Sequence, residues 1–338
     1  LYTVQGVLYV LVTKIAYLSV GFVSAVARPA ILMLTGMTGL FTLVFVCLQR
    51  KSFEPRLKAT LTRPFLSEIS RYAAPLIPIT VITWLNSSVS QLALRNLLGF
   101  EDVGIFTSAL GLASSINIIQ SGFNTYWAPY VFENYQKDDK RRFFTVHRVM
   151  ACALTLFGLG ITVLQQPVFL LLGKSYRSAV IYFPFLFLSP ICYCLSETTG
   201  MGINIAKKTY WTTIIFGLSV VANMALCYLL IPVIGAPGAA MATALSAVLS
   251  LVLRTVIGEK YYKAISNYRY VGYTIGLMSG ASMLNLWLAD SPLLKYVLLV
   301  LVLALACLLF RKEIGELWTL LRQILSELVR KRGAKEGK

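Results

Sequence analysis

The sequence predicts an all-α, polytopic membrane protein with about ten transmembrane helices. Two features of its composition support this: 57% of the 338 residues are hydrophobic, and only 13% are charged. Soluble domains contain about 25% charged residues. The apolar residues also gather in blocks of about 20, the length that crosses the hydrocarbon core of a bilayer as a helix. Because lipid offers no hydrogen-bond partners to the backbone, helices are the expected element.

Ten apolar blocks follow one another along the chain. The predicted spans are 4–26, 30–49, 72–97, 104–128, 148–171, 179–205, 210–231, 236–256, 270–289 and 292–310. Between the seventh and the eighth, Pro232 is expected to end one helix, and Gly235 and Gly238 to allow a tight reversal. The small residues from Gly238 to Ala247 predict a smooth helix face for close packing against a neighbouring helix.

Most of the basic residues lie on one side of the predicted membrane protein. If residue 1 is cytoplasmic, the outside connections hold Arg28, Lys174, Arg177 and Lys295. Lys14 and Arg95 lie within spans, and the other Lys and Arg fall on inside connections or adjoining helix ends. This asymmetry predicts a multi-pass protein of the cell membrane with both termini of the chain in the cytoplasm. It also explains the net charge of +17 without nucleic acid as a partner.

The segment after residue 310 has a different pattern. Apolar residues recur at helical spacing among charged residues, and the run Arg330-Lys331-Arg332 follows. We predict an amphipathic, basic helix on the inner membrane surface, with anionic lipids as its partners.

Four stretches between residues 71 and 243 have a common order and spacing. They are Arg71-Tyr72 with Pro75 and Pro78, followed by 98–106; Gly122-Phe123 with Trp127 and Pro129; Gly202-Ile203-Asn204 with Lys207-Lys208-Thr209; and Asn223 with 229–243. Together they resemble polysaccharide flippases, the O-antigen and capsule lipid-linked oligosaccharide exporters of the multidrug/oligosaccharidyl-lipid/polysaccharide superfamily. The family often has an acidic–basic pair where this chain has Ser90-Gln91, so no charge is carried over to those positions.

The resemblance implies a transporter fold of two six-helix bundles. Residues 1–50 would be the last two helices of the first bundle, 51–71 a cytoplasmic linker, 72–256 the second bundle, 257–310 an extra helix pair and 311–338 the basic tail. Most of the first bundle would then be missing from a chain truncated at its N-terminus.

The resemblance also implies the substrate, an undecaprenyl-pyrophosphate-linked oligosaccharide. It would be moved from the inner to the outer leaflet by alternating access, without a cofactor. Other polysaccharide-assembly proteins are candidate partners.

Charged side chains inside spans are costly and normally face a cavity or a partner. Lys14 lies near the middle of the first span, which favours a cavity over lipid. Arg95 lies near the outer end of its span and is expected to reach the headgroups. Glu197 is the only carboxylate within a predicted span. A coupling proton, a cation partner and a structural ion pair all remain open for it.

Uncharged polar residues gather on two spans. They are Asn86 and Gln91 on 72–97, and Asn117, Gln120 and Asn124 on 104–128. The last three share one helical face. Hydrogen bonding between helices explains any one of them, whereas the whole face is a candidate lining for a sugar path. With Lys14, Arg95 and Glu197, these residues are the candidate substrate-binding residues.

Other functions remain as alternatives. They are a cation-coupled multidrug exporter of the same superfamily, a membrane polysaccharide polymerase or ligase, and a structural scaffold. The short outside connections disfavour a polymerase or ligase, and the sequence contains no Walker loop or HExxH motif, so an enzyme is not expected. His147, the single histidine, is expected to face solvent or headgroups at an inner helix end.

Overall fold

The computed structural model describes residues 27–48, 67, 76–137, 140–170, 172–263, 265, 267–319 and 322. Within these residues the regular elements are helices, and no strand occurs. The chain divides into two compact units, Leu1–Pro75 and Leu76–Lys338. The first unit contains helix α2 (Ala27–Leu48). Lys14 and the predicted span 4–26 lie outside the described residues.

The second unit contains the remaining helices. They are α5 (Leu76–Leu97), α6 (Phe100–Ala113), α7 (Ile116–Asn134), η2 (Tyr135–Lys137), α8 (Lys140–Val163), α9 (Gln165–Leu170), η3 (Lys174–Ile181), α10 (Phe183–Thr199), α11 (Met201–Ile205), α12 (Tyr210–Ile234), α13 (Ala236–Tyr261), α14 (Arg269–Trp287) and α15 (Pro292–Leu309). Residues 311–319 form a further helical segment after α15.

Several of these helices are suited to cross a membrane. Among the described residues, α8, α12, α13 and α15 are long and apolar enough to do so. The pair of η3 and α10, bent by 68°, forms a fifth candidate. The structure therefore supports a multi-pass, all-helical membrane protein with four or five such helices in its described part.

Three of the predicted spans are broken in the structure. The block 104–128 divides between α6 and α7, where the Ser114 hydroxyl donates to the Leu110 carbonyl at 2.7 Å. The block 148–171 divides at Leu164, and the block 179–205 divides into η3, α10 and α11. Average hydropathy does not detect these breaks, because the residues at them are apolar or small.

The bend between η3 and α10 is fixed by a buried amide network. The side-chain amide of Asn285 on α14 donates to the carbonyl oxygens of Val180 at 2.8 Å and Ile181 at 2.7 Å. Gln165 donates in turn to the side-chain oxygen of Asn285 at 2.6 Å. These bonds satisfy carbonyl groups that a bend in a membrane helix would otherwise expose to lipid.

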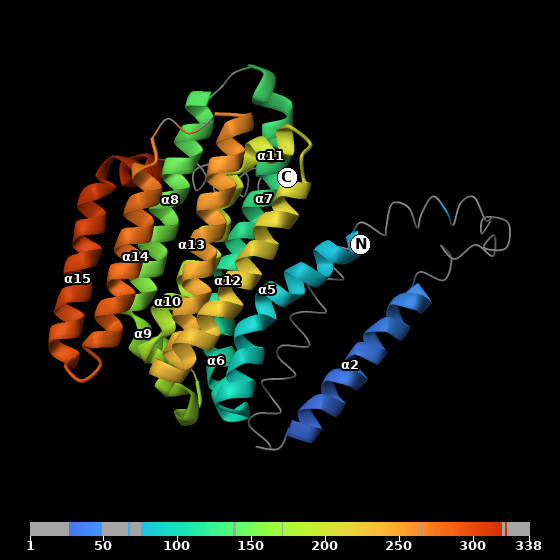
Figure 1. Ribbon diagram of the computed structural model, residues 1–338, viewed down its shortest axis with the longest axis vertical. Coiled ribbons are helices and arrows are strands. Elements are labelled where there is room, and N and C mark those ends of the chain that lie inside the picture. Colours follow the sequence, from blue (N-terminus) through green and yellow to red (C-terminus); the bar gives the residue numbers. More distant parts are fainter. Residues whose placement is uncertain are drawn as a thin grey trace, which may run out of the picture. The chain divides into compact units, whose positions relative to one another are not determined.

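Helix α10 lies at the centre of the second unit. It packs against α6, α7, α8, α13 and α14, and most of its side chains are buried. In Figure 1 the long helices of this unit stand side by side. The turns α12–α13 and α14–α15 lie at the lower end, and the connections before α8, α12 and α14 lie at the upper end.

Basic residues gather at the upper end in Figure 1, which we call the basic end. Its connections and adjoining helix ends carry Lys140, Arg141, Arg142, Lys207, Lys208, Lys260, Lys263, Arg269, Arg311 and Lys312. The opposite end carries Arg95, Lys174, Arg177 and Lys295 in the described residues. The charge asymmetry seen in the sequence is thus an asymmetry between two ends of one helical unit.

The α12–α13 turn is tighter than the sequence predicts. The prediction that Pro232 ends a helix is wrong, because α12 continues through it to Ile234. A proline near the last turn costs one backbone hydrogen bond, which the helix tolerates there. Gly235 makes the reversal with φ of 67°, a conformation that favours glycine. A Cβ atom at Gly238 would lie 2.6 Å from the Leu230 carbonyl, so the two helices touch through their backbones.

The predicted small-residue face of α13 is buried, as expected for a helix seam. Its buried members are Gly238, Ala239, Ala240, Ala242, Ala244, Ser246 and Ala247. At its other end α13 meets the connection between α10 and α11 in the same way. A Cβ atom at Gly258 would lie 2.8 Å from the Gly200 Cα atom and the Thr199 carbonyl oxygen. A Cβ atom at Gly202 would collide with the Gly258 carbonyl oxygen.

The first part of the basic tail packs onto the bundle. Glu313, in the segment 311–319, is buried, and it meets Arg148 on α8 at 3.0 Å and the Tyr270 hydroxyl on α14 at 2.9 Å. Glu316 lies 3.0 Å from the same guanidinium. Ion pairs therefore hold residues 311–319 against α8 and α14, and the basic run at 330–332 lies outside the described residues.

We predict that Gly202→Ala destabilises the fold, because the added methyl group forces the backbones of α11 and α13 apart. Overpacking of this kind costs about 1–3 kcal/mol. The thermal unfolding midpoint of the protein in detergent should therefore fall. Gly217→Ala on α12 is the control, since a Cβ atom there has open space around it. Equal midpoints for the two variants would contradict the close approach.

Candidate functional site

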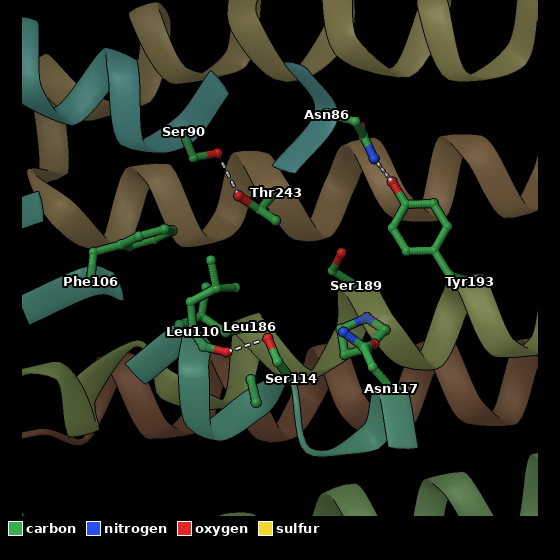
Figure 2. A pocket seen from close by; sticks show the side chains of 12 residues that line it. Asn86, Ser90, Phe106, Leu110, Ser114, Asn117, Leu186, Ser189, Tyr193 and Thr243 are labelled. Carbon is green, nitrogen blue, oxygen red and sulfur yellow. Dashed lines mark hydrogen bonds between the residues drawn. The ribbon is translucent and has the colours of Figure 1, made fainter. Parts of the chain in front are cut away.

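A pocket of about 170 Å³ lies inside the second unit, between α5, α6, α7, α10 and α13. Figure 2 shows its lining from close by. The polar side chains are those of Asn86, Ser90, Ser114, Asn117, Ser189, Tyr193 and Thr243. Phe106, Leu110, Ala113, Leu186 and Pro190 complete the lining. This set of hydroxyl and amide groups without a charge, which we call the uncharged pocket, is suited to hydrogen-bond a neutral group.

Two polar groups at the uncharged pocket, one hydroxyl and one backbone carbonyl, keep hydrogen-bonding capacity for a ligand. The Asn86 amide donates to the Tyr193 hydroxyl at 2.5 Å (Figure 2), which leaves the phenolic hydrogen for another acceptor. Pro190, inside α10, has no backbone N–H, so the Leu186 carbonyl lacks its usual helical donor. Leu186 and Pro190 both line the pocket. The pocket thus offers a hydrogen-bond donor and an acceptor on α10, a helix that is otherwise largely apolar in this region.

One wall of the uncharged pocket is a buried polar network. The hydroxyl groups of Ser90 on α5 and Thr243 on α13 lie 2.7 Å apart (Figure 2). The Asn223 amide on α12 donates to the same Ser90 oxygen at 3.2 Å. Three helices are therefore joined through one serine side chain.

A second pocket, of about 130 Å³, lies between α7, α10 and α11. Its polar lining comes from Asn124, Trp127, Glu197 and Asn204. The Trp127 indole N–H donates to the backbone carbonyl of Glu197 at 3.2 Å, which joins α7 to α10. We call this the Glu197 pocket. It brings a carboxylate, two amides and an indole together near the basic end.

The two pockets follow one another along the seam between α7 and α10. Asn117 lines the uncharged pocket and Asn124 the Glu197 pocket, and seven residues of helix separate them, or about 10 Å. Pro190 and Glu197 on α10 are also seven residues apart and line the same two pockets. A spacing of seven returns to nearly the same helix face. The facing sides of α7 and α10 therefore form a polar track.

Glu197 forms an ion pair with Arg254, a residue that its sequence position places at an inner helix end. Arg254 on α13 lies 3.0 Å from the Glu197 carboxylate and donates to the Ser196 hydroxyl at 2.8 Å. The Arg254 side chain is 5% exposed and that of Glu197 is 23% exposed. Of the interpretations left open for Glu197, this geometry favours a structural ion pair, with the carboxylate still at the wall of its pocket.

The expectation that His147 faces solvent or headgroups is wrong. The imidazole is fully buried between α8 and α10, with Nδ1 2.8 Å from the Thr198 hydroxyl oxygen. That hydroxyl donates its single hydrogen to the Leu195 carbonyl at 2.7 Å. Nδ1 must therefore be the protonated nitrogen and donate to Thr198. Nε2 has no hydrogen-bond partner among the described residues.

The remaining candidate residues do not converge on these pockets. Gln91 and Gln120 are half-buried on α5 and α7 and are not part of either lining. Arg95 is exposed in the last turn of α5, with its guanidinium 4.8 Å from the centre of the Phe100 ring. Lys14 cannot be placed, because it lies outside the described residues.

Tyr193 of the polar track and Arg254, the ion-pair partner of Glu197, were missed from the sequence. Tyr193 was hidden within an apolar block, although its spacing of four from Glu197 places both on one helix face. Arg254 was assigned to an inner helix end, because α13 was expected to end at 256 and instead continues to Tyr261. The longer helix moves Arg254 into the protein interior.

Comparison of the chain with protein-family models, with curated proteins and with solved structures finds no match. The resemblance of the four stretches to polysaccharide flippases therefore stays a hypothesis. What the protein does must be inferred from its residues and their arrangement.

We predict that Arg254→Met lowers the free energy of unfolding by about 1–3 kcal/mol, because it leaves the half-buried Glu197 carboxylate without its partner. The double variant Arg254→Met/Glu197→Gln should recover most of this loss, which chemical denaturation in detergent would measure. Arg95→Met, at an exposed position, is the control and should change stability by less than about 0.5 kcal/mol. A double variant no more stable than the single one would contradict a structural ion pair.

Proposed function

We propose that the protein is a flippase for an undecaprenyl-pyrophosphate-linked oligosaccharide, acting by alternating access in the cell membrane. The observation that carries this proposal is the polar track between α7 and α10. Its two pockets lie within a unit of largely apolar helices, and all the polar side chains that line the first pocket are uncharged hydroxyl and amide groups. Such groups recognise sugar hydroxyls, and a transporter needs them along its path.

The proposed flippase also has a defined number of spans, a two-bundle fold and an orientation in the membrane. The chain has ten spans, and the second unit corresponds to one bundle of a two-bundle transporter together with an extra helix pair. The basic end faces the cytoplasm, as do both termini of the chain. Lys14 is the cation that meets the pyrophosphate, since the described pockets offer no net positive charge.

A cation-coupled drug exporter is the second candidate, because Glu197 places a carboxylate at a pocket wall. The ion pair with Arg254 weakens this alternative, since that carboxylate is already neutralised.

The proposed transport predicts a defined defect in cells that lack the gene. Lipid-linked oligosaccharide should accumulate on the inner leaflet, and the mature surface polysaccharide should be lost. Extraction of the lipid-linked fraction with glycan analysis measures both. Normal surface polysaccharide, with no accumulated intermediate, would overturn the flippase assignment. Export of a cationic dye that is lost with the gene would favour the drug exporter.

We also predict that single changes in the uncharged pocket reduce export. Asn117→Leu and Tyr193→Phe each remove one hydrogen-bonding group and should lower the export rate about tenfold, the effect of roughly 1.4 kcal/mol. Protein abundance should not change. Thr125→Val is the matched control, because this exposed residue of α7 lines neither pocket. An equal loss in the control would show that the effect comes from the helix and not from the pocket.

The orientation is tested by labelling of introduced cysteines. Cysteines at Lys174 or Gly235 should react with an impermeant thiol reagent from outside intact cells. Cysteines at Lys140 or Lys208, at the basic end, should react only after the membrane is opened. The reverse pattern would overturn the proposed orientation.

A further inference from the structure

A group of lysines and aromatic residues meets at the basic end, where α11 joins α12 and α13 ends. Its members are Lys207, Lys208, Tyr210, Trp211, Lys260 and Tyr261, which we call the lysine–aromatic cluster. Lys207, Lys208 and Lys260 are exposed. The cluster lies outside both pockets, and its role is independent of the proposed transport.

The backbone of the cluster adopts a conformation that lysine disfavours. Lys207 has φ of 57°, and it is the one non-glycine residue with positive φ in the described part of the chain. Its N–H donates to the Asn204 carbonyl, and the N–H of Lys208 donates to the Ile203 carbonyl, both at 3.0 Å. This pair of bonds is the Schellman motif, whose left-handed position usually holds glycine. A strained lysine at a turn suggests that its side chain has a function there.

The Lys208 ammonium group lies over one aromatic ring, which a second aromatic side chain orients. Nζ of Lys208 lies 5.0 Å from the centre of the Tyr261 ring. The Trp211 indole donates to the Tyr261 hydroxyl at 3.0 Å, which joins the start of α12 to the end of α13. Cation–π contact and this hydrogen bond together restrict where Lys208 presents its charge.

The nearby carboxylate is already engaged elsewhere. One oxygen of Glu259 accepts from the Ile265 backbone N–H at 3.0 Å, and the other accepts from the Tyr268 hydroxyl at 3.1 Å. Burial, with the Glu259 carboxylate as the next cause, raises the pKa of Tyr268. Among the described residues, the ion pairs involve Arg148 and Arg254, so the cluster lysines keep their charge uncompensated.

An exposed apolar stripe begins at the cluster and runs along α12. It consists of Tyr210, Ile214, Leu218 and Val221, which are 53%, 44%, 51% and 67% exposed. Eleven residues of helix span about 16 Å, close to the thickness of one leaflet's hydrocarbon layer. Trp and Tyr beside the charges suit the membrane interface. The lysines lie at one end of this stripe, and the stripe is about as long as an acyl chain. This arrangement is complementary to a phospholipid, which has a charged headgroup and apolar chains.

We propose that α12 carries a binding site for one anionic phospholipid, with its phosphate on Lys207 and Lys208 and an acyl chain along the Tyr210–Val221 stripe. A free phosphate would use the two lysines but would gain nothing from the stripe. The phospholipid is therefore the favoured ligand. The site would recognise a phosphate diester that carries an apolar tail.

The test follows the environment of Trp211 in the full chain. Protein labelled with 5-fluorotryptophan is titrated in neutral detergent with short-chain phosphatidylglycerol or, separately, phosphatidylcholine, and ¹⁹F NMR is recorded. The Trp211 signal is assigned by its loss in Trp211→Phe. It should shift in a saturable way at lower concentrations of the anionic lipid than of the zwitterionic one. Trp287, exposed near the opposite end on α14, is the internal control and should not distinguish the lipids.

Two variants separate charge from turn geometry. Lys207→Gly keeps the left-handed turn and removes one charge, and Lys208→Gln removes the other. Each should weaken the anionic preference about fivefold, as expected for one ammonium group near a headgroup. Lys207→Arg should retain the preference. Unchanged signals from the other fluorotryptophans show that each variant is folded.

Three results would overturn the proposal. They are equal responses of Trp211 to the two lipids, an anionic preference that survives Lys207→Gly/Lys208→Gln, and displacement of the lipid by inorganic phosphate at similar concentrations. The last result would assign the site to a soluble anion.

Discussion

The structure of the second unit depends on the close backbone contact between α13 and the α10–α11 connection. In lipid, helices gain little from burying apolar side chains against each other, so they associate through close packing and interhelical hydrogen bonds. Gly202 and Gly258 allow that approach, since a Cβ atom at either of them would lie within 2.9 Å of backbone atoms on the opposite side of the contact. The approach brings the Thr255 hydroxyl to 2.8 Å from Thr199 and Arg254 within reach of Ser196 and Glu197. The ion pair is therefore a consequence of the seam.

Three consecutive residues of α10 form hydrogen bonds with three different neighbouring helices. Successive residues of a helix point about 100° apart. Ser196 accepts from α13, the carbonyl of Glu197 accepts from Trp127 on α7, and Thr198 accepts from His147 on α8. A run of four polar residues at the end of an apolar helix thus fixes the positions of three other helices. The same run places the Glu197 carboxylate at the second pocket.

Sequence patterns predicted those features that depend on composition along one helix. The bounds of α12 to α15 lie within about five residues of the predicted spans, and the buried small-residue face of α13 followed from its sequence. Of the candidate polar residues, Asn86, Asn117, Asn124 and Glu197 line the two pockets. Features that depend on contacts between helices could not be predicted in this way. The burial of His147, the partner of Glu197 and the amide network at Asn285 each join residues more than 50 positions apart.

The distribution of charge in the second unit limits what its interior can bind. The uncharged pocket has no ionised lining residue, and the carboxylate of the Glu197 pocket is balanced by Arg254. An anion moved from water into this interior would lose hydration without gaining an opposite net charge. A neutral hydroxylated group, by contrast, exchanges water for hydroxyl and amide partners at little cost. The polar track is therefore suited to the uncharged part of a ligand. A lipid-linked oligosaccharide meets this condition only if its pyrophosphate is bound by cations elsewhere in the protein while its sugars follow the track.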